Sequence, residues 1–203
     1  MQSIDNKLVS RIYGHQRGWV FSKNDFLDLG SDAAIRKALS RLEIKGTIRR
    51  VLRGVYDYPR ISTLLNEPMG PDLDELASAL ARKSSWRIQP SENTALNQLG
   101  LSTQVPVQSV YLSDGPSKSY EIGKRQLTFK KRSLKESGFK LRESELVVQA
   151  LKALGQERID AHVCKKLSKK WSPDLWQKIL RDTKTAPAWV SDIILNISKR
   201  FDS

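Results

Sequence analysis

Residues 31–59 carry the side chains whose chemistry stands out in this sequence. Three arginines, Arg49, Arg50 and Arg53, fall within five residues. Guanidinium groups pair with phosphate oxygens and donate to base edges, so such a cluster is typical of a nucleic-acid contact surface. The alternative is a solvated charged face. A matching helix just before the arginines favours the nucleic-acid interpretation.

That helix is predicted to begin after Ser31, because the Ser31 hydroxyl can cap the first turn and Asp32 places a negative charge at the positive helix end. Four apolar residues then follow the spacing of one buried stripe: Ile35, Ala38, Leu39 and Leu42. The opposite face is small and cationic, with Ala33, Lys37 and Ser40 outward and Arg36 and Arg41 on the flanks. We expect this face to enter the major groove of DNA, whereas the alternative is a protein-contact surface.

The segment from Thr47 to Tyr58 is predicted to form a β-hairpin. β-branched and aromatic residues flank Leu52-Arg53-Gly54, and Gly54 can supply the positive φ of a tight turn. Upstream, the pattern predicts a helix over 4–14, a short strand over 18–21 and a second short helix over 22–29. This order predicts a winged helix-turn-helix over residues 1–65. The residues expected to contact DNA are Lys23, Ser31, Ala33, Arg36, Lys37, Ser40, Arg41, Arg49, Arg50 and Arg53.

The phrase Gly46-Thr47-Ile48-Arg49-Arg50-Val51-Leu52-Arg53-Gly54-Val55-Tyr56 resembles the wing motif of the AbiEi-type antitoxins. A looser likeness continues through a Ser-x-x-Thr-Ala-Leu helix at 91–96 and Gln104-Val105-Pro106. The resemblance implies a DNA-binding antitoxin and autorepressor of a type IV toxin–antitoxin system used in phage defence. It also implies a nucleotidyltransferase-like toxin as partner, opposed either directly or through the toxin's target.

The net charge of +13 and the pI near 9.9 point to a polyanionic partner, either nucleic acid or an acidic protein surface. The positive charge is concentrated in residues 1–71, 116–143 and 144–203, whereas 72–115 carries three Lys and Arg against five Asp and Glu. A length of 203 residues with 39% hydrophobic content allows two small globular domains.

Residues 60–71 contain Pro68, Gly70 and Pro71 and are the predicted domain boundary. We therefore expect an α+β protein. Its winged helix is followed by a domain over 72–203, with a mixed α/β part at 72–143 and a helical part at 144–203. The α/β part is predicted to contain a small antiparallel sheet, with strands at 107–113 and 119–131. Helices are predicted around 146–154 and over 157–170, 173–181 and 187–200.

Two further basic clusters lie in the second domain and are candidates for toxin or nucleic-acid contact. They comprise Lys124, Arg125, Lys130, Lys131 and Arg132, and then Lys165, Lys166, Lys169 and Lys170. For the first cluster, the alternative is an edge strand that lysines protect from unwanted pairing. In the second cluster, like charges repel at i,i+4 spacing, which a nearby anion would relieve. Trp171 and Trp176 beside it could stack on a base, but core packing is the commoner role.

No residue is assigned a catalytic role. His15 lacks an acidic neighbour in the sequence, and His162 and Cys164 diverge on a helix. One cysteine and two histidines make a zinc site improbable, and no cofactor motif occurs. Because no signal peptide or long apolar run is visible, we expect a cytoplasmic protein without membrane contact.

The expected function is therefore that of an antitoxin that represses its own promoter. About five phosphate contacts would give a log–log salt slope of roughly −4 to −5. Such modest binding predicts inverted repeats in the operator, read by a homodimer or by cooperative monomers. The alternatives are a stand-alone transcriptional regulator and an RNA-binding protein that uses its basic C-terminal half.

Overall fold

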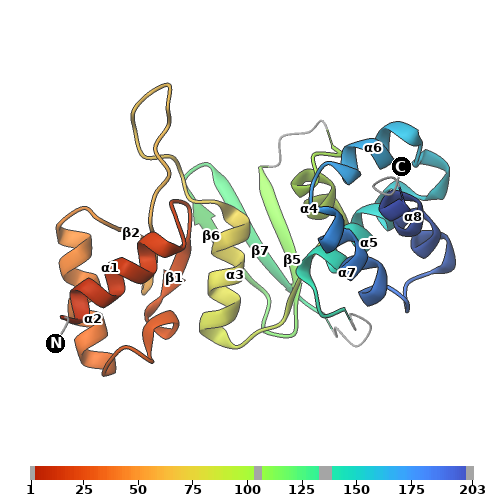
Figure 1. The fold of residues 1–203 in the computed structure, drawn as a ribbon. Helices are drawn as coiled ribbons and strands as arrows, with labels where there is room; N and C mark the ends of the chain where they lie inside the picture. The colour runs from red at the N-terminus through yellow and green to blue at the C-terminus, as the bar shows by residue number, and fades with distance from the viewer. Residues whose placement is uncertain (1–2, 103–106, 133–138, 200–203) are drawn as a thin grey trace. The chain divides into compact units, whose positions relative to one another are not determined.

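The computed structural model describes residues 3–102, 107–132 and 139–199 (Figure 1). The fold is mixed α+β, and the chain divides into two compact units, Met1–Trp86 and Arg87–Ser203. The division lies after Trp86, rather than within the proline-rich segment where the sequence places it. The helix that follows this segment packs against a strand of the first unit, which accounts for the difference.

The first unit contains, in chain order, α1 (Ile4–Gly14), β1 (Val20–Ser22), the 3₁₀ turn η1 (Lys23–Phe26), α2 (Asp32–Ile44), β2 (Arg49–Leu52), β3 (Val55–Asp57) and α3 (Leu73–Ser84). The predicted first helix, the helix capped by Ser31 and the hairpin are confirmed. The Ser31 hydroxyl accepts from the Ala34 N–H, and Gly54 has φ +70° in the two-residue turn between β2 and β3.

The predicted second helix is a single 3₁₀ turn. Ser22 caps it, and Asp25 completes the capping box by accepting from the Ser22 backbone N–H. Asn24, Asp25 and Asp28 are weak helix formers, because their side chains compete for backbone hydrogen bonds. In addition, Arg11 of α1 makes a bidentate ion pair with the Asp28 carboxylate, and both N–O distances are 2.6 Å. The segment therefore ends after one turn.

A small antiparallel sheet with strand order β1-β3-β2 joins these elements, so the strand predicted before the 3₁₀ turn does pair with the hairpin. Phe21 and Tyr56 on one face of the sheet pack with the buried stripe of α2 and with Leu8 and Ile12 of α1. This core fixes α2 against the hairpin.

Helix α3 packs against β1, an edge strand of this sheet. Its C-terminal turn is tied down by Arg82, which donates to the Asp25 carboxylate at 2.8 Å and to the Val20 carbonyl at 2.9 Å. The Asn24 side chain donates to the Lys83 carbonyl at 3.2 Å. The end of α3 is therefore held next to η1.

The second unit begins with β4 (Ile88–Pro90), α4 (Glu92–Gln98), β5 (Gln108–Ser113), β6 (Lys118–Ile122) and β7 (Arg125–Lys131). Its sheet has the order β4-β5-β7-β6 and is mixed, so the prediction of an antiparallel sheet is wrong. The predicted strand at 119–131 is a hairpin that turns at Gly123. Its more apolar strand β7 takes the interior place beside β5, which makes β5 and β7 parallel, and the polar strand β6 takes the edge.

The chain then becomes helical, as predicted, through α5 (Arg142–Leu154), η2 (Gln156–Arg158), α6 (Ala161–Ser168), α7 (Pro173–Asp182) and α8 (Ala188–Lys199). These helices and α4 enclose one apolar core, in which Trp176 is fully buried. The sequence motif Gln104-Val105-Pro106 and residue 200 of the predicted last helix lie outside the described residues.

Candidate functional site

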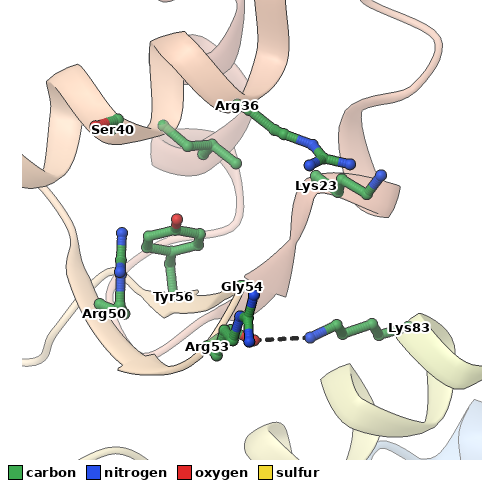
Figure 2. Close-up of a pocket in the computed structure, with 9 residues that line it drawn as sticks. Lys23, Arg36, Ser40, Arg50, Arg53, Gly54, Tyr56 and Lys83 are labelled. Atoms are coloured by element: carbon green, nitrogen blue, oxygen red, sulfur yellow. Dashed lines mark hydrogen bonds between the residues drawn. The ribbon is translucent and has the colours of Figure 1, made fainter. Parts of the chain in front are cut away.

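A pocket of about 440 Å³ opens between α2, the β2–β3 hairpin, η1 and the end of α3 (Figure 2). All of its walls belong to the first unit. Its lining residues are Lys23, Arg36, Leu39, Ser40, Arg50, Arg53, Gly54, Tyr56 and Lys83. Five of these side chains are cationic, and no carboxylate from the described residues lines the pocket. The positive charge of this lining favours an anion over a cation as ligand.

Lys23 and Arg36 converge on one side of the pocket, as Figure 2 shows. Both pair with Asp32 in the first turn of α2: Lys23 Nζ donates to one carboxylate oxygen, and Arg36 Nη2 lies 2.7 Å from the other. These hydrogen bonds hold the pKa of Asp32 below its ordinary value, and the hydrogen bond from Lys23 has the largest effect. Asp32 is thus ionised at neutral pH and orients two cations at once.

Arg50 and Tyr56 form another part of the wall. Arg50 Nη2 donates to Glu43 at 2.8 Å, and the guanidinium carbon lies 5.7 Å from the centroid of the Tyr56 ring. Tyr56 belongs to the core beneath the sheet, so it gives this wall a fixed base. The cation is consequently oriented by a carboxylate and an aromatic ring together.

Arg53 and Lys83 meet at the tip of the hairpin. Lys83 Nζ donates to the Arg53 carbonyl at 2.8 Å. The Arg53 side chain is exposed and has no hydrogen bond or ion pair with any described residue. It therefore remains available to an external anion.

Arg41 and Arg49, both predicted to contact DNA, do not line the pocket. Arg41 makes a bidentate pair with Asp5 of α1 at 2.9 and 2.5 Å. Arg49 makes a bidentate pair with the buried Asp57 at 3.1 and 2.5 Å and also donates to the Met69 carbonyl. Both arginines join elements of the first unit to one another.

On the outward face of α2, Ala33, Lys37 and Ser40 are exposed, as the helical pattern predicts. Lys37 makes no hydrogen bond or ion pair within the described ranges. The Ser31 hydroxyl is occupied as an acceptor in the helix cap. The described structure thus leaves Lys37 and Arg53 without ionic partners on two elements that border one pocket.

The first basic cluster of the second unit lies on β7 and the turn before it. Lys130, Lys131 and Arg132 are exposed at the C-terminal end of β7, and Lys124 and Arg125 at its start. Because β7 lies between β5 and β6, the interpretation as a lysine-protected edge strand does not hold. The cluster is divided between the two ends of an interior strand.

The second cluster, on α6, is explained in part by the adjacent helix. Lys166 Nζ donates to the Gly100 carbonyl, and the Lys170 ammonium lies near the same glycine. Gly100 follows the C-terminal end of α4, where the carbonyls carry partial negative charge and favour cations. The Gly100 carbonyl thus offsets part of the repulsion between Lys166 and Lys170, and all four lysines of the cluster are exposed.

The remaining polar and aromatic candidates have structural surroundings. The His15 ring stacks on Trp19 with centroids 4.0 Å apart, and Trp171 and Trp176 contact each other in the helical core. Within the described ranges, no group of three or more His, Cys, Asp or Glu side chains could hold a metal ion. No described helix is both long and apolar enough to cross a bilayer.

The pocket contains two side chains that the sequence does not single out, Tyr56 and Lys83. Tyr56 lies in the hairpin motif, but the sequence pattern predicts only that it belongs to a strand. Lys83 lies 30 residues after Arg53, beyond the predicted boundary, where a basic residue at the end of a helix is ordinary. Only the packing of α3 on the first unit identifies Lys83 as part of the pocket.

Comparison with known families gives one finding. A family described as "Family of unknown function (DUF6088)" matches residues 7–176, which include the pocket, both sheets and the chain as far as Trp176. Comparison with curated proteins gives no significant match. Because the match covers most of its length, this chain belongs to the DUF6088 family.

Proposed function

We propose that the first unit is a winged helix-turn-helix that binds double-stranded DNA, with α2 as recognition helix and the β2–β3 hairpin as wing. The observation that carries this proposal is the cationic pocket between α2 and the hairpin. Leaving Lys83 aside, three cations of this pocket, Lys23, Arg36 and Arg50, pair with only two carboxylates, Asp32 and Glu43, and the fourth, Arg53, has no ion pair among the described residues. Such an excess of positive charge at a helix and a hairpin favours the phosphate backbone.

In this proposal α2 lies in the major groove with Ala33, Lys37 and Ser40 toward the base edges. Small side chains at 33 and 40 let the helix come close, and Lys37 can donate to a guanine edge. Arg53 at the hairpin tip meets the adjacent backbone or the minor groove. Lys23 and Arg36 meet phosphates by exchanging part of their pairing with Asp32.

We extend the proposal to regulation: the protein represses its own promoter and opposes a nucleotidyltransferase-like toxin. This extension draws on the resemblance of residues 46–56 to the AbiEi wing motif. A gene for such a toxin next to the gene of this protein would support the extension. Absence of such a gene would favour the alternative of a stand-alone regulator.

A second candidate, RNA binding by the second unit, is favoured by charge. Residues 87–203 carry 21 Lys and Arg against 12 Asp and Glu, whereas residues 1–86 carry 14 against 10. Tighter binding to structured RNA than to duplex DNA of equal length, at equal salt, would support this candidate.

The test of DNA binding is a gel shift with the DNA upstream of the protein's own gene, at two salt concentrations and with unrelated duplex as competitor. The Lys37→Ala/Arg53→Ala variant removes the exposed cations of α2 and of the hairpin tip that have no ion pair among the described residues, and it keeps the ion pair between Arg49 and Asp57. The control Lys7→Ala/Lys152→Ala removes two exposed lysines elsewhere. We expect binding that resists competitor in the wild type and the control, and its loss in the test variant. Equal binding to both DNAs would contradict sequence-specific regulation.

A further inference from the structure

We propose that the pocket is a binding site for the phosphate and sugar of one nucleotide unit, and that Lys83 of α3 is one of its phosphate-binding residues. The inference rests on the proposed function and deepens it, because it assigns a specific ligand group to the pocket. It also extends the nucleic-acid-binding module to a helix outside the predicted winged helix.

The charges of the pocket select a phosphate. Lys23, Arg36, Arg50, Arg53 and Lys83 reach it from four different elements, so their charges surround one volume. Guanidinium and ammonium groups form charge-assisted hydrogen bonds to phosphate oxygens, which are shorter and stronger than neutral ones. A monoanionic or dianionic phosphate would neutralise part of the excess positive charge that the two carboxylates leave.

The volume of the pocket and its uncharged lining residues favour a ligand larger than a bare phosphate. A volume of about 440 Å³ lies within the range of small-molecule sites and exceeds the space that one phosphate needs. Leu39 and Tyr56 supply apolar surface for a sugar, and the Ser40 hydroxyl can donate or accept. A nucleotide unit presents this combination of anion, apolar ring carbons and hydroxyl or ester oxygens.

Lys83 is placed before any ligand arrives. Its Nζ donates to the Arg53 carbonyl, and its own carbonyl accepts from Asn24, while Arg82 beside it is bound to Asp25 and Val20. The hydrogen bond to Arg53 fixes the ammonium at the pocket wall, where a phosphate oxygen can accept from it. Preorganisation of this kind lowers the entropic cost of binding.

Gly54 permits the approach of Lys83 to the hairpin tip. Its φ of +70° is a conformation that side chains rarely adopt, and a Cβ there would lie 3.3 Å from Lys83 Nζ. The turn glycine thus serves the hairpin and the pocket together. Figure 2 shows the hydrogen bond from Lys83 to the Arg53 carbonyl, which makes the α3 wall part of the site rather than an unrelated neighbour.

The experiment titrates the full-length protein with inorganic pyrophosphate and with adenosine monophosphate by isothermal titration calorimetry at low and moderate salt. Lys83→Gln removes the charge, Lys83→Arg keeps it, and Lys7→Gln removes an exposed lysine outside the pocket. Thermal unfolding of each variant verifies folding. We expect saturable binding to the wild type, weakening of about tenfold in Lys83→Gln, and near wild-type binding in Lys83→Arg and Lys7→Gln.

The proposal is overturned if the folded wild type shows no saturable binding of either probe, or if Lys7→Gln weakens binding as much as Lys83→Gln. Lys37→Gln separates this result from the proposed function, because Lys37 does not line the pocket. Weaker duplex binding without weaker pyrophosphate binding in Lys37→Gln is expected. Pyrophosphate binding without duplex binding would retain the site and refute the DNA-binding function.

A competition arm identifies the source of the phosphate. If duplex DNA displaces pyrophosphate, the pocket holds a backbone phosphate of the nucleic acid. If both bind together, the occupant is a free nucleotide that the protein carries beside the duplex. Either result confirms the pocket as a phosphate site and names its ligand.

Discussion

Arg49 and Arg53 lie four residues apart in one hairpin and have different surroundings. The Arg53 side chain is exposed and unpaired within the described part of the chain, so it can meet a phosphate at no cost in internal contacts. Arg53→Ala should weaken binding to every duplex alike and reduce the log–log salt slope by about one, as expected for a lost phosphate contact. Fluorescence anisotropy over a salt series measures the slope. A loss confined to one base position would instead identify Arg53 as a base-reading residue.

Arg49→Ala should act on stability instead. Its bidentate partner Asp57 is only 1% exposed, and removal of the arginine leaves a buried carboxylate without that partner. An unsatisfied buried charged group costs about 2 kcal/mol or more, partly reduced here because Arg49 itself is half-exposed. Urea unfolding should show this loss for Arg49→Ala and little change for Arg53→Ala. Equal stability of both variants would contradict the assigned role of Arg49.

At the scale of elements, the N-terminus of α5 is capped by a residue of α7. The Asp182 carboxylate accepts from the backbone N–H groups of Lys140 and Leu141 at 2.9 to 3.0 Å. Burial alone would raise the pKa of Asp182, but these hydrogen bonds lower it below the ordinary value. Asp182 is therefore charged, and its charge acts on Glu145 in the first turn of α5.

Glu145 makes this junction sensitive to pH. Burial raises the pKa of Glu145 from 4.5 to about 7, and repulsion from the Asp182 charge is the second, smaller cause. The folded state therefore binds the proton more tightly than the unfolded chain, and the stability due to this group is lost as pH rises from about 4.5 to about 7. Glu145→Gln should stabilise the protein by about 1–2 kcal/mol at pH 8, after allowance for solvent screening, with a smaller effect toward pH 4.5.

Chemical denaturation of Glu145→Gln across this pH range checks the prediction, with Glu157→Gln as the matched control. Glu157 is exposed in the same unit, so its replacement removes one negative charge without relieving a buried one. A stability difference that does not vary with pH in Glu145→Gln would contradict the assignment.

The elements that local signals govern could be predicted from the sequence. α2 follows from the Ser31 cap and its apolar stripe, and the hairpin follows from Gly54. The 3₁₀ turn could not be predicted, because it depends on the ion pair between Arg11 of α1 and Asp28. The β6–β7 hairpin could not be predicted either, because it depends on the pairing of β7 with β5. The same limit applies to the site, since Lys83 joins the pocket through the packing of α3.

At the scale of the whole molecule, both units carry positive charge, and the second carries more. The exposed cations of β7 and α6 would add sequence-independent attraction to any polyanion, whereas the proposed sequence reading resides in the first unit. The full chain should therefore bind with a steeper salt dependence than the first unit alone. The cut that separates the units must follow the structural division after Trp86.

A fragment of residues 1–86 should fold, and a fragment of residues 1–65 should be much less stable. The longer fragment keeps α3, which packs on β1 and whose Arg82 bonds Asp25 and the Val20 carbonyl. The shorter one exposes Val20, which is fully buried, and loses both contacts of Arg82, a combined cost of roughly 3 kcal/mol. That is a large part of the 5–15 kcal/mol typical of a small domain. Circular dichroism during thermal unfolding compares the fragments. Equal melting temperatures would mean that α3 does not stabilise the first unit. The pocket wall that Lys83 supplies would then not be an integral part of this unit.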